Sequence, residues 1–354
     1  MSNILITGAA GYIGGSILAE ILAKSALLKK DQIFAAVRSD TQVGALSKLG
    51  VTVLQLDLTN EEDVAENVAR NDINIVIHTS SAIDPKTALY LITALSKQGK
   101  VSGKRTYFIH TSGMSAFYKN TGWPAGDFKD TDGVFETEKR LAASFPIRNT
   151  DVSVIEHAAA QGVTSFVVVP SLVYGRGSGE WNKLSVVLPV YVEAIISNKA
   201  VYKFPGNTKV SAVHISDLTV LYGQIVEKIL QEKPIPNGKE GYYFGKAHEL
   251  FFGDVLDKLA EAMEVRGLLA DSTTRVYPDD ASAAKILGVP EQFVQILWNS
   301  GDDIIPEIPK IVAWKPKWDK EHFFEHIDDE IQDVLDLGKA KSSLIDSLFK
   351  ATRG

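Results

Sequence analysis

The sequence predicts an α/β fold built on a doubly wound parallel sheet, with a smaller, mostly helical C-terminal lobe. Short apolar runs rich in β-branched residues alternate with stretches of helical period through the first half of the chain. Nearly continuous apolar strands are typical of a parallel sheet that is covered by helices on both faces. The 354 residues are enough for one large domain or two interlocked ones.

Six buried strands are expected in the first half, joined by right-handed helical crossovers. They are residues 4–7, 33–37, 51–56, 73–77, 106–111 and 163–169. The segment 118–151 interrupts this rhythm, because it is rich in glycine, charged residues and aromatics and shows no clean period. We interpret it either as an active-site loop or as a surface insertion without chemistry.

The pattern changes after residue 175. Helices are expected at 184–196, 218–230, 250–263 and 323–337, with short strands at 210–215 and 242–244. We therefore predict a main domain over residues 1–175 and a smaller lobe over residues 176–354. Segments near 210–245 are expected to return to the main domain.

Composition excludes several classes of function. With 37 Lys+Arg against 44 Asp+Glu the net charge is -7, which argues against nucleic-acid binding. The absence of cysteine excludes disulfides, thiol nucleophiles and thiolate metal sites. The sequence contains no apolar run long enough for a membrane span and no N-terminal basic region typical of a secretory signal. We expect a cytoplasmic protein with no membrane partner.

A glycine-rich turn lies directly after the first expected strand and leads into the first helix. It reads Gly8-Ala9-Ala10-Gly11-Tyr12-Ile13-Gly14. The glycines allow a tight turn and a close approach of the backbone to a pyrophosphate, and the helix N-terminus offers N–H groups and partial positive charge. Strand, turn and helix together predict a dinucleotide site at Gly8, Gly11, Tyr12, Ile13 and Gly14, the alternative being a glycine turn without a ligand.

Together with four further motifs, this turn resembles the extended, atypical short-chain dehydrogenase/reductase superfamily. The motifs are Leu56-Asp57-Leu58, His78-Thr79-Ser80-Ser81-Ala82, Pro170-Ser171-Leu172-Val173-Tyr174-Gly175 and Val213-His214-Ile215-Ser216-Asp217-Leu218. The style is similar to fungal NAD(P)-dependent epimerase/dehydratase-like and NmrA-like proteins. The resemblance covers most of residues 1–250 and implies a Rossmann-type main domain followed by a substrate lobe.

The resemblance also assigns residues to the two ends of a bound cofactor. It implies that Asp57 and Leu58 contact the adenine. It places three residues beside the cofactor after the fourth strand, namely Thr79, Ser80 and Ser81. Of these, Thr79 and Ser80 are expected on the nicotinamide side together with Thr111 and Pro170, and Val173 is a further expected cofactor contact.

The end of the second strand bears on the choice of nicotinamide cofactor. A basic residue there accommodates the 2′-phosphate of NADP, whereas an acidic one binds the free ribose of NAD. The sequence has Arg38 followed by Ser39, and a guanidinium pairs with phosphate in a fork. We therefore favour NADP(H) over NAD(H), although Asp40 leaves NAD(H) open and Arg38 could be a solvated strand-end charge.

The Tyr-x-x-x-Lys dyad that the superfamily uses in reductase chemistry is absent. Of the eleven tyrosines only Tyr242 has a lysine four residues on, Lys246, and this pair follows the proline signature instead of preceding it. At the expected side of that signature, Lys139 has the spacing but Phe135 replaces the tyrosine, and the helix expected at 151–161, the better equivalent, has neither residue. Phenylalanine cannot exchange a proton with a substrate.

Three hydroxyl groups are candidates for catalysis in place of the dyad. Ser112 follows the fifth strand and is the better hydroxyl near the nicotinamide, although a shift of one residue would put Gly113 there. Tyr118 and Tyr174 are candidate proton donors. For all three the alternative is structural, because such hydroxyls also cap turns and pack in cores.

The sequence thus predicts an NADP(H)-dependent oxidoreductase that acts on a small carbonyl or alcohol held between the lobes. Two alternatives stay open: an NmrA-like dinucleotide-binding regulator without catalysis, and an epimerase or lyase that keeps its cofactor. His322 and His326 have a zinc-like spacing but no evident third ligand, so we expect no metal site. A monomer or homodimer is expected.

Overall fold

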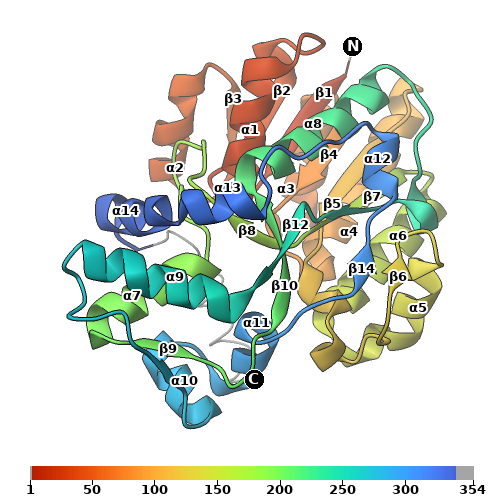
Figure 1. Ribbon diagram of the computed structural model, residues 1–354. Coiled ribbons are helices and arrows are strands. Elements are labelled where there is room, and N and C mark those ends of the chain that lie inside the picture. Colours follow the sequence, from red (N-terminus) through yellow and green to blue (C-terminus); the bar gives the residue numbers. More distant parts are fainter. Residues whose placement is uncertain (1, 340–354) are drawn as a thin grey trace.

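A seven-stranded parallel sheet forms the centre of the molecule in a computed structural model that describes residues 2–339 (Figure 1). Its strand order is β11-β7-β5-β4-β1-β2-β3, and every neighbouring pair is parallel. The strands are β1 (Asn3–Thr7), β2 (Ile33–Val37), β3 (Thr52–Gln55), β4 (Ile73–His78), β5 (Tyr107–Thr111), β7 (Thr164–Pro170) and β11 (Tyr242–Gly245). The predicted Rossmann-type α/β fold is confirmed.

Helices cover both faces of this sheet, because the buried strands carry apolar side chains on both of their faces. One face packs against α1 (Tyr12–Lys24), α2 (Asp40–Leu46) and α8 (Ile215–Leu230). The other packs against α3 (Glu61–Arg70), α4 (Pro85–Ser102) and α6 (Pro146–Gln161), with α5 (Val134–Leu141) near the β11 edge. In β1, for example, Ile4 and Ile6 face α1 while Leu5 faces the opposite layer.

A smaller lobe with its own hydrophobic core lies below the main sheet in Figure 1. Its three-stranded sheet is formed by β8 (Leu172–Tyr174), β10 (Lys209–His214) and β12 (His248–Phe251). The helices of the lobe are α7 (Val187–Asn198), α9 (Phe252–Val265), α10 (Asp280–Leu287), α11 (Val294–Trp298), α13 (Lys320–Glu325) and α14 (Ile327–Leu337). Residues 340–354 of the predicted lobe lie outside the described residues.

Two short strand pairs lie outside these sheets, the first between the two parts and the second within the lobe. The pairs are β6 (Phe128–Lys129) with β14 (Ile304–Ile305) and β9 (Val201–Lys203) with β13 (Thr274–Val276), and α12 (Ile308–Ile311) follows β14. The single-turn helices are Lys30–Gln32, Ser47–Leu49, Met114–Phe117, Lys119–Thr121, Ala142–Ser144, Gly238–Glu240 and Glu291–Phe293. Within residues 2–339 no helix is long and apolar enough to cross a membrane.

Three expected elements differ from the observed ones. The segment 118–151 is not irregular throughout, since it holds β6, all of α5 and the start of α6. The expected helix 250–263 begins only at Phe252, because β12 occupies the two residues before it, and the expected helix 323–337 is broken at His326. The helices of segment 118–151 lack an apolar period because their inner faces carry charged residues, among them Glu138, Arg148 and Asp151.

Segments after residue 175 return to the main domain. Strand β11 extends the edge of the main sheet beside β7, and α8 packs against α1. Asp217 at the start of α8 is buried, and its carboxylate accepts hydrogen bonds from the backbone amides of Lys317 and Trp318, each 2.9 Å long. The boundary at residue 175 stays a prediction.

A glycine-lined seam joins the turn after β8 to α1 and to α14. The Tyr12 hydroxyl donates to the Gly175 carbonyl at 2.7 Å, and the Gly175 amide donates to Glu330 Oε1 at 2.6 Å. A Cβ on Gly179 would lie 2.9 Å from the backbone of Gly15, so the seam admits no larger residue there. Burial raises the pKa of Glu330 to about 7, with a further contribution from the nearby Asp333 charge.

Glu330 is expected to make stability depend on pH in a defined direction. Below about pH 4.5 the Glu330 carboxyl is protonated in both the folded and unfolded chain, so its contribution is fully present there. That contribution is lost as the pH rises through about 7, because the unfolded chain ionises first. We expect the free energy of unfolding to fall by about 3 kcal/mol across this window.

The measurement is denaturant unfolding across this pH range in matched variants. Glu330→Gln keeps an oxygen that accepts from Gly175 and should remove most of the fall. Glu325→Gln, an exposed position on the neighbouring helix α13, should keep the wild-type pH dependence. An unchanged slope in Glu330→Gln would contradict this assignment.

Candidate active site

The glycine turn after β1 has the geometry of an anion site. Gly8 has a φ of +69°, and the Gly11 amide donates to the Gly8 carbonyl at 2.7 Å. No side chain caps α1, and its first turn holds no acidic residue, so its N–H groups are available to a bound anion. A Cβ on Gly14 would collide with the Gly8 carbonyl oxygen and the Thr79 hydroxyl, so the turn has no room for a side chain at position 14.

The predicted cofactor residues follow the carboxyl ends of neighbouring strands. Asp57 comes after β3, Arg38 after β2, Gly8 after β1, Thr79 after β4 and Ser112 after β5. The strand order reverses between β1 and β4, which is where open α/β sheets bind ligands. Neighbouring strands lie about 4.8 Å apart, so this row spans about 19 Å, a length suited to an extended dinucleotide.

The β3–β2 end of the row is exposed. Arg38 projects from the end of β2, where its backbone amide donates to Gln42 Oε1 at 3.0 Å. Ser39 caps α2 by accepting from the Gln42 amide at 3.4 Å. The Asp57 carboxylate accepts from the Thr59 hydroxyl and amide, which lowers its pKa, and Leu58 is half-buried beside it.

Hydroxyl groups surround the point where β1 meets β4. The Thr79 hydroxyl donates to the Thr7 carbonyl at 2.8 Å, and the Ser80 hydroxyl donates to Thr7 Oγ1 at 2.8 Å. Thr7 Oγ1 also lies 2.9 Å from Nδ1 of His78, whose pKa is lowered to about 3, mainly by burial and then by His110. Ser81 instead accepts from two amides of the next turn, at residues 83 and 84.

A cluster of polar side chains is buried at the end of β5. The Ser112 hydroxyl donates to Asp151 Oδ2 at 2.5 Å, and His110 Nε2 makes a close polar contact of 3.1 Å with Asp151 Oδ1 that is not a well-aligned hydrogen bond. The Tyr242 hydroxyl donates to Glu138 Oε2 at 2.5 Å. Ser112 is 6% exposed, and Asp151, His110 and Glu138 are not exposed at all.

Neither remnant of the usual dyad is assembled. Tyr242 bonds to Glu138, whereas Lys246 Nζ bonds to Glu249 and to the Ile304 carbonyl. Phe135 is buried in the core beneath α5, with the Lys139 ammonium over its ring at 6.0 Å. A hydrogen-bonded Ser112–Asp151 pair stands at the end of β5 instead.

The other predicted catalytic and nicotinamide-side residues make no side-chain hydrogen bond to Ser112 in the described part of the chain. Thr111 turns its hydroxyl to the Tyr222 hydroxyl on α8 at 2.6 Å. Tyr174 is buried in the lobe against Phe323, His214 and other rings, and its hydroxyl has no hydrogen-bond partner among the described residues. Pro170 ends β7, and Val173 pairs with Val213 in the smaller sheet.

Tyr118 directly precedes Lys119, which lines a polar cavity between the segment after β5 and the lobe. The cavity measures about 230 Å³ and is lined by Lys119, Asn120, Thr208, Lys209, Asn299, Ser300, Gly301, Asp302 and Asp303. Burial, followed by the Asp302 charge, raises the pKa of Tyr118, so the phenol keeps its proton. The volume approaches the lower end of the range for small-molecule sites, about 300 Å³.

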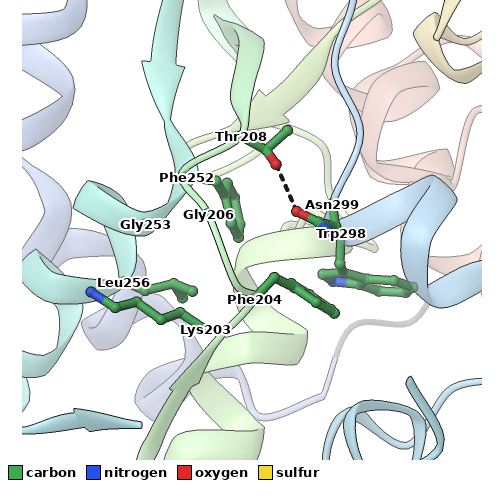
Figure 2. Close-up of a pocket in the computed structure, with 9 residues that line it drawn as sticks. All are labelled: Lys203, Phe204, Gly206, Thr208, Phe252, Gly253, Leu256, Trp298 and Asn299. Atoms are coloured by element: carbon green, nitrogen blue, oxygen red, sulfur yellow. Dashed lines mark hydrogen bonds between the residues drawn. The ribbon is translucent and has the colours of Figure 1, made fainter. Parts of the chain in front are cut away.

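A second cavity lies deeper in the lobe and is too small for a substrate. It measures about 10 Å³ and is framed by Phe204, Phe252, Trp298 and the 2.6 Å hydrogen bond between Thr208 and Asn299 (Figure 2). A cavity of this size holds at most one water molecule.

The histidines with zinc-like spacing do not share one helix. Helix α13 ends at Glu325, and His326 stands between α13 and α14. His322 Nδ1 bonds to the Asp319 carboxylate at 2.7 Å, which raises the pKa of His322. Within residues 2–339 no three side chains of the ligand types are grouped so as to hold a metal ion.

Three buried charged residues, Glu138, Arg148 and Asp151, were not predicted from the sequence. Arg148 is fully buried and donates to the carbonyls of Ala116 and Thr121, at 2.6 and 2.8 Å. The signal that could have found them is spacing, because residues 148, 151 and 155 share one face of a helix. Charged side chains on the inner stripe of a helix indicate a buried polar cluster.

Comparisons with known proteins agree with this architecture. The model of the NAD dependent epimerase/dehydratase family matches residues 4–235. A solved dTDP-glucose 4,6-dehydratase from Bacillus anthracis, in complex with NAD, covers 96% of this chain and 98% of its own at a TM-score of 0.65 and 13% identity. A UDP-glucose 4-epimerase from Thermotoga maritima, with UDP-glucose, covers 94% and 99% at a TM-score of 0.63 and 14% identity.

A curated relative matches a smaller part of the chain. The decarboxylating sterol-4-alpha-carboxylate 3-dehydrogenase of Dictyostelium discoideum is 30% identical over 84 residues. These residues are 24% of this chain and 24% of that relative, so the chain spans about a quarter of the relative's length in the match. The likeness to the solved structures, at 13–14% identity, shows the fold alone.

Proposed function

Because the chain belongs to the NAD-dependent epimerase/dehydratase family, we propose that it is an NADP(H)-dependent oxidoreductase that acts on a small carbonyl or alcohol. A bound nicotinamide would supply hydride transfer to or from the substrate carbon. The remaining chemistry falls to the chain itself, which must hold the cofactor, orient the substrate and move one proton. We propose that it acts as a cytoplasmic monomer or homodimer.

The residues along the sheet edge fit an NADP-type dinucleotide. The closed turn of Gly8, Gly11 and Gly14 with the uncapped start of α1 would hold the pyrophosphate. Arg38 is exposed at the end of β2, where a 2′-phosphate would meet its guanidinium. Asp40 is also exposed there, as the first residue of α2, and is the group that would favour NAD(H) instead.

The observation that carries the proposal is the position and bonding of Ser112. His78 and His110 are register partners in β4 and β5, so Ser80 and Ser112 each lie two residues beyond this pair, at the proposed nicotinamide end of the row. The Ser112 proton points to Asp151 at 2.5 Å, which leaves its lone pairs able to accept from a substrate hydroxyl.

Burial of this site favours a second candidate function. Only 6% of Ser112 is exposed, and Asp151 has no exposed surface. A dinucleotide-binding regulator without catalysis needs no access to these groups, whereas an enzyme must admit a substrate oxygen to Ser112. The two functions differ in one observable, which is substrate-dependent oxidation of NADPH.

We expect Ser112→Ala to lower turnover by about 100-fold or more without weakening NADPH binding, because it removes the hydroxyl that contacts the substrate oxygen. The measurement follows NADPH absorbance with a panel of aldehydes and ketones, alongside a binding titration. Ser115→Ala, the same substitution three residues along the chain, is the control and should keep wild-type turnover. Equal turnover in Ser112→Ala would remove the proposed role.

The wild-type protein also separates the alternatives. No change in NADPH absorbance with any substrate, together with tight binding, would favour the regulator. Product formation without net consumption of cofactor would favour an epimerase or lyase.

A further inference from the structure

Two buried carboxyl groups face each other behind Ser112. Glu138 lies on the inner face of α5 and Asp151 on that of α6, and neither is exposed to solvent. Glu138 Oε1 and Asp151 Oδ1 each lack a hydrogen-bond donor, although the two carboxyls are close enough to hydrogen-bond to each other. Such a bond forms only if one of the two carboxyls carries a proton.

The surrounding donors decide which carboxyl carries it. Asp151 faces the Ser112 hydroxyl at 2.5 Å and the His110 ring at 3.1 Å, whereas Glu138 faces the Tyr242 hydroxyl alone. The imidazole nitrogen beside Asp151, which has no counterpart beside Glu138, favours a negative charge on Asp151. Burial and the Asp151 charge both raise the pKa of Glu138. The proton therefore rests on Glu138 and the charge on Asp151.

Resting on the proposed function, we propose that Asp151 is the base that takes the proton of Ser112, with protonated Glu138 as the donor that holds Asp151 in place. In the oxidation direction the substrate hydroxyl gives its proton to Ser112 Oγ, and Ser112 gives its own proton to Asp151 Oδ2. A bound oxidised nicotinamide would accept the C–H hydrogen with its electron pair, and the substrate carbon would become a carbonyl. The proton on Asp151 is released to water when the product leaves, and reduction reverses each transfer.

This arrangement supplies what the missing dyad does in other members of the superfamily. Asp151 acts through Ser112 and is a positioning and proton-accepting residue, while Ser112 alone contacts the substrate. The titratable or charged groups around the carboxyl pair are His110 on β5, Arg148 on α6, Tyr242 on β11 and Glu136 on α5, with His78 stacked behind His110. Among them Arg148 offsets the single negative charge.

The first test replaces the base without changing its shape. We expect Asp151→Asn to lower turnover by about 100-fold or more, the usual contribution of a general base. The dissociation constant for NADPH should stay within about twofold, because no cofactor contact is removed. The pH profile of the remaining activity should lose the limb that belongs to the carboxyl pair.

The second test observes the Glu138 proton directly and needs no turnover. Infrared spectra of the apo-protein at about pH 8.5, above the pKa of Glu330, should show the carbonyl band of a protonated carboxyl. Glu138→Gln should remove that band, keep an amide donor for Asp151 and abolish the alkaline limb of the pH profile. Glu136→Gln, exposed on the same helix and paired with Lys239, should change neither.

The outcomes separate this proposal from the proposed function. An active wild type with equal turnover and pH profile in Asp151→Asn would overturn the base role and leave the oxidoreductase standing. A band that survives in Glu138→Gln would overturn the shared proton. A wild type that oxidises or reduces nothing would overturn the proposed function and the base role with it, even if the band shows the proton on Glu138.

Discussion

Gly14→Ala is expected to abolish dinucleotide binding. The added Cβ would collide with the Gly8 carbonyl oxygen and the Thr79 hydroxyl. The first of these is a backbone atom already fixed by the 2.7 Å hydrogen bond from the Gly11 amide, so the turn must open. An opened turn no longer aims its amides at a pyrophosphate, and we expect affinity to fall by about 100-fold or more.

The same substitution has a matched control elsewhere in the chain. Gly44 lies in α2, where an added Cβ would meet nothing within 4 Å, so Gly44→Ala should bind the dinucleotide normally and gain up to about 1 kcal/mol of helix stability. Overpacking at Gly14 should instead reduce the free energy of unfolding by about 1–3 kcal/mol. Thermal unfolding and a fluorescence titration of both variants give the two quantities. Normal binding by Gly14→Ala would show that the turn holds no phosphate.

Arg148→Ala should produce the largest loss of stability. The guanidinium donates to the carbonyls of Ala116 and Thr121, to the Thr121 hydroxyl and to Ser144 Oγ, at distances of 2.6 to 3.0 Å. It also lies over the Trp123 ring. Truncation leaves the buried Ala116 carbonyl and the half-buried Thr121 oxygens without these donors, and leaves the Glu138–Asp151 pair without its nearby cation. We expect the free energy of unfolding to fall by about 3–5 kcal/mol.

The Arg148→Ala substitution should also destabilise one segment of the chain locally, in addition to lowering the free energy of unfolding. Arg148 ties the start of α6 to the segment 114–123, so hydrogen exchange in that segment should rise in the variant. Arg140→Ala is the control, because Arg140 is exposed on α5 and makes one 3.3 Å contact, with Thr137. Its unfolding curve should match that of the wild type. A change below about 1 kcal/mol in Arg148→Ala would contradict the anchoring role.

Much of the fold could be predicted because parallel strands that are buried on both faces are apolar at nearly every position. The runs at 33–37 and 73–77 are examples, and both are strands of the main sheet. The resemblance to the epimerase/dehydratase branch of the superfamily is confirmed by the match over residues 4–235. Helix α5 and the start of α6 were missed because Glu138 and Arg148 are buried there, whereas a charge in a sequence usually indicates exposure.

How much of the site could be predicted also depends on whether its residues are close together in the sequence. The glycine turn is local, so its strand, turn and helix are visible in seven consecutive residues. Ser112 was named from its place after a strand, but its partner Asp151 is 39 residues away and is brought there only by the packing of α6 against the sheet. The roles of Ser112, Tyr118, Tyr174 and the cofactor residues stay predictions.

The central claim is that the carboxyl edge of the sheet binds an NADP-type dinucleotide. The most direct test is a fluorescence titration of the wild-type protein with NADPH and, in parallel, NADH. We expect NADPH to bind at least about tenfold more tightly, because Arg38 pairs with the 2′-phosphate. Equal or tighter binding of NADH would contradict the Arg38 assignment and point to Asp40. If neither binds, in reduced or oxidised form, the claim is wrong.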